Sequence, residues 1–381
     1  MYLQAEPHRK RIIDTFCALT SIDAESFNER EIADAVRRRL EDMGFTVEED
    51  EAGQALGGNA GNLYGVLAGD PALTPVLFSA HLDTVQPGRG KRAHVDEKGA
   101  ITGDSRAILG ADDVNGITEI LEGIRLVQES GCRHGDIEVL FTVAEERYAL
   151  GGGVFDFSRV RSPIAYTLDM AEPVGKAAVQ APSIVSFSVE VQGRDAHAGF
   201  APEKGAHAIK AAAEAMACLP LGRVEEDVTC NIGTVEGGRA ANIVPDRCLL
   251  TGEIRSYRHA RAMAWLERIR KAFSEQAAAC GCTAEMQSTV HLQAYAISKD
   301  EPVCRRFLAA CGKLGIPTPP GGRFRSTFGG SDNNHFAAHG VRGIVLGNGM
   351  QATHSVKEHT DAAQLEQGAR LVAALIVENE T

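Results

Sequence analysis

The sequence predicts an α/β protein in which a mixed sheet flanked by helices is interrupted by a smaller, ferredoxin-like α+β domain. The chain has 381 residues, which is too long for one ordinary core and indicates about two domains. In the parts nearest the two ends, short apolar runs alternate with amphipathic helical patterns, as in α/β proteins. Beyond Pro182 the pattern changes to the order β-α-β-β-α-β, the ferredoxin-like split motif.

The main domain is expected to alternate strands and helices. A charged amphipathic pattern predicts a helix at residues 31–43, followed by strands at 46–48 and 62–67. Apolar runs predict four buried strands, at residues 76–80, 137–144, 164–168 and 343–346. A helix with an apolar face follows Asp113; that face contains Ile117, Ile120, Leu121 and Ile124. Residues 1–182 and 294–381 therefore form one discontinuous domain.

The interrupting segment has its own order of elements. Strands are expected at residues 184–192, 228–235, 247–255 and 283–293, with helices at 205–219 and 259–280. The second helix has four large apolar side chains spaced for one buried face: Trp265, Leu266, Ile269 and Phe273. We assign residues 183–293 to this inserted domain, the lid.

Residues that can ligate metals or transfer protons follow the predicted strands of the main domain. They are His81 and Asp83 after the first, Glu145 and Glu146 after the second, Asp169 after the third, and His354 in the loop after the fourth. Asp112 and Asp113 lie just before a helix. In an open α/β sheet, sites are built at the C-terminal edge of the strands. We therefore expect these side chains to converge.

The residue types indicate a hydrolase with two metal ions. Imidazoles and carboxylates suit a divalent ion such as zinc, and one carboxylate can bridge two ions. Two ions about 3.5–4 Å apart polarise a carbonyl and activate a water, whose proton a free carboxylate must take. We assign Glu145 as this base and Glu146 as a ligand. Asp83, two residues after His81, is placed to orient its imidazole.

Each signal has an ordinary alternative when taken alone. Asp113 or Asn115 could simply cap the following helix, and adjacent glutamates are usually solvated. The sequence has no His-Glu-x-x-His helix and no Cys-x-x-Cys pair that would indicate a simpler, mononuclear site. The agreement of four strand ends and one helix start favours the metal site.

Four segments carry a family resemblance: Ser79–Val85, Gly110–Asp113, Ala144–Glu146 and Thr353–Glu358. They resemble, in order, the motifs of the dinuclear zinc peptidase superfamily that includes peptidase T, glutamate carboxypeptidase and aminoacylase. The Gly-Ala-Asp-Asp form is most similar to the peptidase T-like branch. The resemblance extends over essentially the whole chain and implies a zinc-peptidase catalytic domain with an inserted lid and dimerisation domain.

The resemblance implies two zinc ions per subunit, which Co²⁺ or Mn²⁺ could replace. One ion would be held by His81 and Asp169, the other by Glu146 and His354, with Asp112 between them. It further implies that Asp83 orients His81, that Glu145 is the general acid and base, and that the Asp112–Asp113 peptide bond is cis.

The implied activity is zinc-dependent hydrolysis of amide bonds in small peptides. Similarity to peptidase T indicates an aminotripeptidase that removes the N-terminal residue. The alternatives are a carboxypeptidase or an N-acyl amino acid amidohydrolase of the same superfamily. An alternative of another class is a catalytically inert metal-binding protein.

The lid and a nearby loop carry candidate substrate-binding residues. A histidine can stabilise an oxyanion, and arginine or asparagine can bind a carboxylate or carbonyl. His197, Asn242 and Arg255 match lid motifs of the superfamily, although structural roles would also account for them. The resemblance implies a homodimer through the lid, with His197 and Asn242 acting in the partner's site. Arg325 is a further candidate, for the C-terminal carboxylate of the substrate.

One segment departs from the family pattern. After Glu146 the chain continues Arg147-Tyr148-Ala149-Leu150, where relatives usually carry small residues. A bulky tyrosine beside the metals could narrow the cleft or add a contact to the substrate.

Composition agrees with a cytoplasmic peptidase of small peptides. The net charge of -12 opposes binding to nucleic acid or anionic membranes. Nine cysteines without a framework of spacings indicate reduced thiols, and we interpret Cys280 and Cys282 as turn residues. The N-terminus is polar, without a secretory signal, and the longest apolar stretches are far shorter than the roughly 20 residues that span a bilayer.

Overall fold

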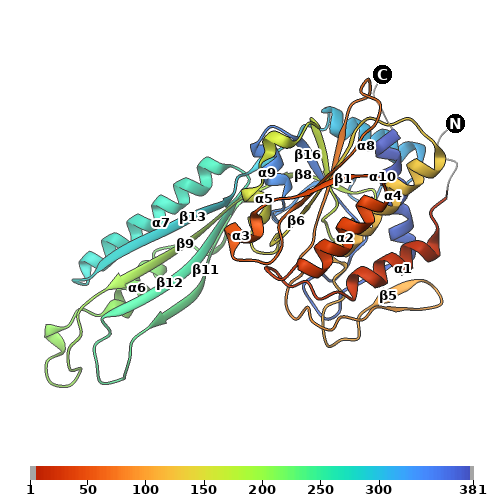
Figure 1. The fold of residues 1–381 in the computed structure, drawn as a ribbon. Helices are drawn as coiled ribbons and strands as arrows, with labels where there is room; N and C mark the ends of the chain where they lie inside the picture. Colours follow the sequence, from red (N-terminus) through yellow and green to blue (C-terminus); the bar gives the residue numbers. More distant parts are fainter. Residues whose placement is uncertain (1–5, 378–381) are drawn as a thin grey trace. The chain divides into compact units, whose positions relative to one another are not determined.

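The computed structural model describes residues 6–377, which form two compact units (Figure 1). Unit 1 contains the residues up to Gln180, 296–327 and those from Ser331 onward, and unit 2 contains 181–295 and 328–330. The main boundaries differ by two residues from those expected, 182/183 and 293/294.

The short segment 328–330 was expected in the main domain but clusters with unit 2. Its Phe328 explains this, because the ring lies 4.5 Å from that of Tyr257 and 4.4 Å from the guanidinium carbon of Arg223. The Phe328 carbonyl also accepts a hydrogen bond of 2.7 Å from Arg255. These contacts are made by a side chain far along the sequence, so no local pattern could predict them.

Unit 1 is built on a nine-stranded mixed sheet, in the order β1-β2-β6-β3-β7-β16-β8-β14 with β15 beside β8. The strands are β1 (Thr46–Glu49), β2 (Leu63–Leu67), β3 (Val76–His81), β6 (Ile137–Thr142), β7 (Ile164–Thr167), β8 (Ala177–Ala181), β14 (Tyr295–Ala296), β15 (Phe324–Ser326) and β16 (Arg342–Leu346). Strands β6, β3, β7 and β16 are parallel neighbours. The four apolar runs singled out in the sequence therefore form the parallel centre of the sheet, whose strands are buried along their length.

Helices cover this sheet and pack on one another. They are α1 (Arg9–Thr20), α2 (Arg30–Asp42), α3 (Ala52–Leu56), α4 (Ala111–Ser130), α5 (Leu150–Val154), α8 (Pro302–Lys313), α9 (Asn333–Ala338) and α10 (Ala362–Val377). Helix α4 packs on β3 and on α10, while α8 and α9 pack on β7 and β16. The approach of α4 to α10 is close, because a Cβ at Gly123 would lie 2.6 Å from Val372.

A second, three-stranded sheet in unit 1 was not expected. It consists of β4 (His94–Val95), β5 (Ala100–Thr102) and β17 (His359–Asp361), in the order β17-β5-β4. Strands of two or three residues are too short to show an alternating pattern. The pairing of β17 with β5 places the segment after His354 beside residues 100–102, which are far from it in the sequence.

Unit 2 has the predicted ferredoxin-like topology. Its elements are β9 (Ser183–Gln192), α6 (Ala208–Ala217), β10 (Gly222–Glu225), β11 (Val228–Gly237), β12 (Arg247–Ser256), α7 (His259–Ala279) and β13 (Thr283–Leu292). The antiparallel sheet has the order β10-β11-β12-β9-β13. The additional strand β10 is short and polar, and only its hairpin with β11 identifies it.

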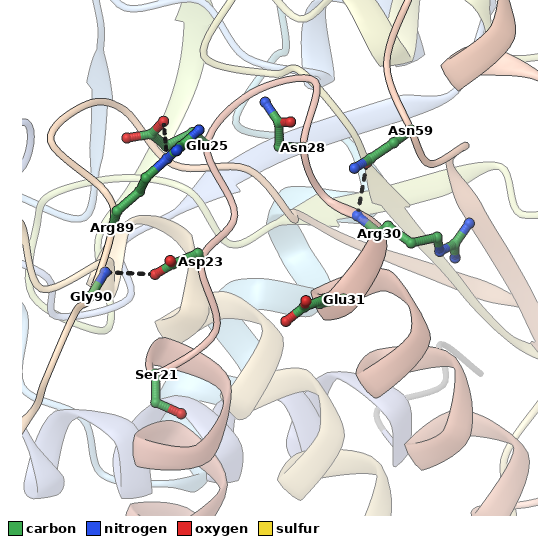
Figure 2. Close-up of a pocket in the computed structure, with 9 residues that line it drawn as sticks. All are labelled: Ser21, Asp23, Glu25, Asn28, Arg30, Glu31, Asn59, Arg89 and Gly90. Atoms are coloured by element: carbon green, nitrogen blue, oxygen red, sulfur yellow. Dashed lines mark hydrogen bonds and ion pairs between the residues drawn. The ribbon is translucent and has the colours of Figure 1, made fainter.

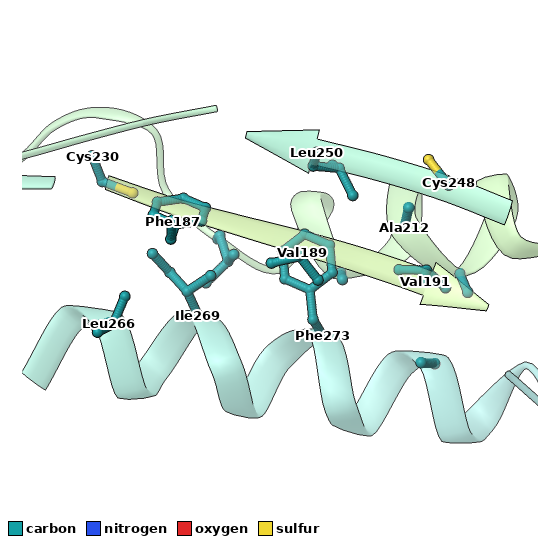
Figure 3. Packing of buried hydrophobic residues seen from close by; sticks show 14 of the residues in the cluster. Phe187, Val189, Val191, Ala212, Cys230, Cys248, Leu250, Leu266, Ile269 and Phe273 are labelled. Atoms are coloured by element: carbon teal, nitrogen blue, oxygen red, sulfur yellow. The ribbon is translucent and has the colours of Figure 1, made fainter. Parts of the chain in front are cut away.

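The core of unit 2 forms where α7 faces the sheet. Figure 3 shows Ile269 and Phe273 of α7 directed at Phe187 and Val189 of β9. All four residues of the predicted apolar face, Trp265, Leu266, Ile269 and Phe273, are buried. The spacing of apolar residues therefore predicted both this helix and its buried side.

Two further findings hold for residues 6–377. Every helix in that range falls short of the length and apolar character needed to cross a bilayer. The nine cysteines all lie there as free thiols.

Replacing Phe273 by alanine should lower the free energy of unfolding of unit 2 by about 3–5 kcal/mol, because the buried ring leaves a cavity. Trp265 is the only tryptophan of the chain and lies on the same helix, so its fluorescence in urea reports on this unit. Lys271→Ala, at a side chain that is 74% exposed, is the control and should change stability by less than about 0.5 kcal/mol. Equal midpoints for the two variants would contradict the packing described.

Candidate metal centre

Parallel strands bring the candidate residues to one edge of the sheet. His81 is the last residue of β3, while Glu145 and Asp169 follow the C-terminal ends of the neighbouring strands β6 and β7. Helix α4, which begins at Ala111, packs on β3 and supplies Asp112. The expected convergence is present, and its cause is the parallel register of these strands.

The ligand-type side chains form two groups that share one carboxylate. His81, Asp112 and Asp169 offer ligand atoms within 4.8 Å of one another, and so do Asp112, Glu146 and His354. Asp112 directs Oδ1 at His81 Nε2, 3.0 Å away, and Oδ2 at His354 Nε2, 3.2 Å away. Glu146 Oε1 lies 3.0 Å from His354 Nε2. Asp112 therefore has the geometry of a bridging carboxylate.

The hydrogen bonding of His81 favours a cation in the first group. Its Nδ1 lies 2.8 Å from the carbonyl oxygen of Asp83, which can only accept, so Nδ1 carries the hydrogen. In the neutral imidazole Nε2 then presents a lone pair, and this lone pair faces Asp112 Oδ1. Two acceptors 3.0 Å apart repel each other unless a proton or metal ion lies between them. The donor set thus fits a divalent cation.

The electrostatics of the carboxylates agree with this fit. Burial, and then the negative charge of Asp112, hold the pKa of Asp169 well above its usual value. Burial also raises the pKa of Glu146. For Asp112 burial has the same effect, but the neighbouring imidazoles of His354 and His81, when protonated, outweigh it and hold its pKa below the ordinary value. The group carries more negative charge than its two histidines offset, and bound metal cations would supply the missing positive charge.

Asp83 does more than the sequence indicated. Its Oδ1 lies 3.5 Å from His81 Nδ1, beyond the usual range of about 2.7–3.2 Å for an N–H···O bond, and its own carbonyl is the nearer partner. The carboxylate instead accepts hydrogen bonds from the backbone N–H groups of Glu145, at 2.8 Å, and Glu146, at 3.2 Å. Ser26 donates a third, of 2.7 Å. Asp83 therefore links the histidine to the glutamate pair.

Glu145 lies in a buried, negatively charged environment. Burial, followed by the charge of Asp169, raises its pKa well above the usual value. A carboxyl group of raised pKa suits a residue that takes and returns a proton near neutral pH.

Glu29 supports the same turn and was missed by sequence reasoning. It is fully buried, and its Oε1 accepts a hydrogen bond of 3.0 Å from the N–H of Ala144. Burial and the nearby Asp83 raise the pKa of Glu29 to about 7. In the sequence it is one acidic residue before a charged helix, and nothing local separates it from an ordinary helix start.

The backbone around Asp112 is held by a second buried glutamate. Glu358 accepts hydrogen bonds from the N–H groups of Gly110, at 2.7 Å, and Asp112, at 2.9 Å. The Asp112–Asp113 peptide bond is cis, as the family resemblance implied. Asp113 accepts a hydrogen bond of 3.2 Å from the N–H of Gly116, so the capping role considered for it is also present.

In unit 2, His197 and Asn242 lie together. The N–H of Ala198 donates to the Asn242 carbonyl at 3.0 Å. His197 Nδ1 accepts hydrogen bonds from the N–H groups of Gly199, at 3.1 Å, and Phe200, at 3.2 Å. These bonds leave the hydrogen of the neutral ring on Nε2, which is therefore a donor.

The two candidate arginines are each engaged with an internal carboxylate. Arg255 forms an ion pair of 2.6 Å with Glu253. In the sheet it lies opposite Ile184, at the start of β9, whereas His197 comes after the C-terminal end of that strand. Arg325, in unit 1, is paired with Glu172. The structure therefore does not bring Arg255 close to His197 within the sheet.

A separate polar hollow of about 600 Å³ lies in unit 1 (Figure 2). Its lining residues are mostly charged and include Asp23, Glu25 and Arg89; Arg89 donates to Glu25 at 3.2 Å. None of the candidate metal ligands lines it. The loop 23–28 beside this hollow also contains Ser26, whose hydroxyl donates a hydrogen bond to Asp83.

Comparison with known proteins relates both parts of the chain to peptidases. Residues 180–279 match a family model described as a peptidase dimerisation domain. An uncharacterized protein of Bacillus subtilis, YqjE, is 35% identical over 97% of this chain and 99% of its own length. The aminopeptidase PepT from Bacillus cereus is 34% identical, with a TM-score of 0.90 over 97% of this chain and 98% of that one. A tripeptidase from Staphylococcus aureus is 29% identical, with a TM-score of 0.93 over 98% and 99% of the two chains.

Asp112→Asn should reduce the metal retained after dialysis by at least about tenfold, because a neutral amide cannot serve as an anionic bridge. Elemental analysis of the dialysed protein gives the metal content per chain. His94→Ala, at an exposed histidine of β4, is the control and should keep the wild-type content. Wild-type content in Asp112→Asn would show that Asp112 is not a ligand.

Proposed function

The chain belongs to the peptidase T-like branch of the M20 metallopeptidase family, and on that premise we propose that it removes the N-terminal residue from tripeptides. It is a metal-dependent peptidase. The observation that carries the metal-dependent chemistry is the Asp112 carboxylate, which has one oxygen facing each of two histidines. The names of its relatives, an aminopeptidase and a tripeptidase, support the choice of substrate.

The proposed metal content is two zinc ions per subunit. His81 and Asp169 would hold one, Glu146 and His354 the other, and Asp112 would contact both. The two groups of ligand atoms that share Asp112 support this division. When bound, such ions polarise the scissile carbonyl and lower the pKa of a water between them.

Glu145 is the proposed general base and acid. Its backbone is fixed by Asp83, and its side chain lies among the same buried carboxylates that raise its pKa. It would take a proton from the attacking water and deliver it to the amine of the leaving peptide. The raised pKa favours the first transfer, since a more basic carboxylate accepts the proton of the water more readily and keeps it until the leaving nitrogen becomes basic enough to take it.

The proposed active form is a homodimer through the lid. The match to a peptidase dimerisation domain supports association of two copies. His197 would donate its Nε2 hydrogen to the oxyanion in the partner's site, and its two backbone contacts favour the required tautomer. Asn242 would bind a substrate carbonyl beside it. Arg255 and Arg325 are the proposed groups for the C-terminal carboxylate, which would have to displace Glu253 or Glu172.

The discriminating experiment compares a free tripeptide with the same peptide N-acetylated, using zinc-loaded enzyme. Cleavage of the free peptide alone supports an aminopeptidase, because the site then requires the α-amine. Cleavage of the acetylated peptide would transfer the assignment to a carboxypeptidase or an N-acyl amino acid amidohydrolase. No cleavage of either would favour an inert metal-binding protein.

Glu145→Gln should lower kcat by about 10²–10⁴-fold, because the amide cannot accept the proton of the water. The metal content should remain that of the wild type, since Glu145 is not a proposed ligand. Steady-state kinetics and elemental analysis on the same sample check both parts. Glu48→Gln, at a side chain that is 64% exposed, is the matched control. Loss of metal together with activity would reassign Glu145 as a ligand.

His197→Ala and Glu145→Gln should each be nearly inactive, and mixing them should restore activity. After random subunit exchange about one quarter of the wild-type rate is expected, because half of the dimers are mixed and each mixed dimer has one complete site. Activity is measured after exchange, with each variant exchanged against itself as the control. No recovery, in a mixture shown to contain mixed dimers, would place His197 in its own subunit's site.

A further inference from the structure

The turn after β6 contains three residues in an unusual backbone conformation. Ala144, Tyr148 and Ala149 have positive φ angles of 50°, 68° and 52°. Side chains with a Cβ are disfavoured in this left-handed region, and a bulky ring is among the least expected there. Glycine would adopt the conformation of Tyr148 without that cost.

The surroundings of the turn hold it in this conformation. Glu29 accepts a hydrogen bond from the N–H of Ala144, and Asp83 accepts one from Glu145. Within the turn, the N–H of Ala149 donates to the Glu145 carbonyl at 2.6 Å. At its far side His335 Nε2 donates to the Ala149 carbonyl at 3.0 Å. These contacts fix the backbone at Ala144, Glu145 and Ala149, on either side of Tyr148.

Burial in the core does not account for a tyrosine at this place. Tyr148 is 41% exposed, whereas Ala144 and Ala149 on either side are each 1% exposed. The two alanines pack inside the molecule, while the large ring reaches solvent. A residue that is strained and also exposed, in the turn that carries the proposed base, indicates a role in function.

The position of the turn relates it to the substrate. Tyr148 follows Glu146 by two residues and Glu145 by three. In an aminopeptidase the attacked carbonyl belongs to the N-terminal residue, so the side chain of that residue is only two bonds from the carbon under attack. That side chain, like the α-amine, therefore lies close to the metal ligands and their supporting turn.

We propose that Tyr148 determines specificity, its ring forming a wall of the cleft that contacts an apolar side chain on the N-terminal residue of the substrate. This inference rests on the proposed aminopeptidase function. A tyrosine offers a large apolar face with a polar tip, which suits a half-exposed wall. One apolar contact of this kind changes kcat/KM by about 10- to 100-fold between substrates. The enzyme should therefore prefer Leu-Gly-Gly and Phe-Gly-Gly to Gly-Gly-Gly.

The test measures kcat/KM of wild type, Tyr148→Gly and Tyr148→Phe on these three peptides. Tyr148→Gly should lose about tenfold or more of the preference for the large N-terminal residue, because the contact is absent. Its kcat/KM on Gly-Gly-Gly should fall less than on the other two peptides, because an N-terminal glycine has no side chain for the ring to contact. Tyr148→Phe keeps the ring and should keep the preference. Arg147→Ala, at the neighbouring position, is the control for a change in the turn itself.

A melting curve separates this role from a structural one. Because glycine fits the positive φ, Tyr148→Gly should melt within a few degrees of the wild type. An unchanged preference in that variant would overturn the inference while leaving the peptidase assignment intact. A wild-type enzyme that cleaves none of the three peptides would instead count against the proposed function, and the inference would fall with it.

Discussion

The carboxylate of Asp112, placed between the Nε2 atoms of two histidines, is the contact on which the rest of unit 1 depends. It comes from the start of α4, whereas its two histidines come from the end of β3 and from the loop after β16. Holding these segments in register requires the parallel centre of the sheet, the packing of α4 on β3, and Glu358 behind the Asp112 backbone. The fold can therefore be understood as the support of one shared carboxylate.

Buried acidic residues support the site at two levels. The carboxylates of the first level face the place where cations would bind, and bound cations would offset the repulsion between them. Those of the second level, Asp83, Glu29 and Glu358, accept backbone N–H groups of the segments that carry the first. A backbone N–H donor fixes the path of the chain, so these acids help to determine where the proposed ligands point. The sharp turn of Glu145 and Glu146 is held in this way from both sides.

The sequence predicts the parts of the fold that are set by local pattern. The central strands and the apolar face of α7 follow from runs and spacings of apolar residues, and the ligand types follow from their positions after strands. What it could not give depends on contacts between distant segments. Examples are the three-stranded sheet that pairs β5 with β17, and Phe328 joining unit 2 through Tyr257. Glu29 belongs to the same class, because its importance comes from Ala144, which is remote in the sequence.

Asp83 shows the limit of reasoning from spacing alone. A separation of two residues correctly places it beside His81, yet the carbonyl rather than the carboxylate makes the shorter contact. Spacing in an extended chain fixes which side a residue lies on, but the side-chain rotamer decides where its carboxylate points. The freed carboxylate is then available to the glutamate pair.

The way in which the chain leaves and re-enters unit 1 has a topological consequence. Strand β8 ends where unit 2 begins, strand β14 starts where it ends, and the two strands are neighbours in the sheet. For unit 1, the whole ferredoxin-like insertion is thus a single connection between two adjacent strands. Closing that connection costs little more in entropy than closing a much shorter one, since the cost rises only with the logarithm of length. A sheet edge of this kind can accept, lose or exchange an entire domain without any change in the order of its other strands.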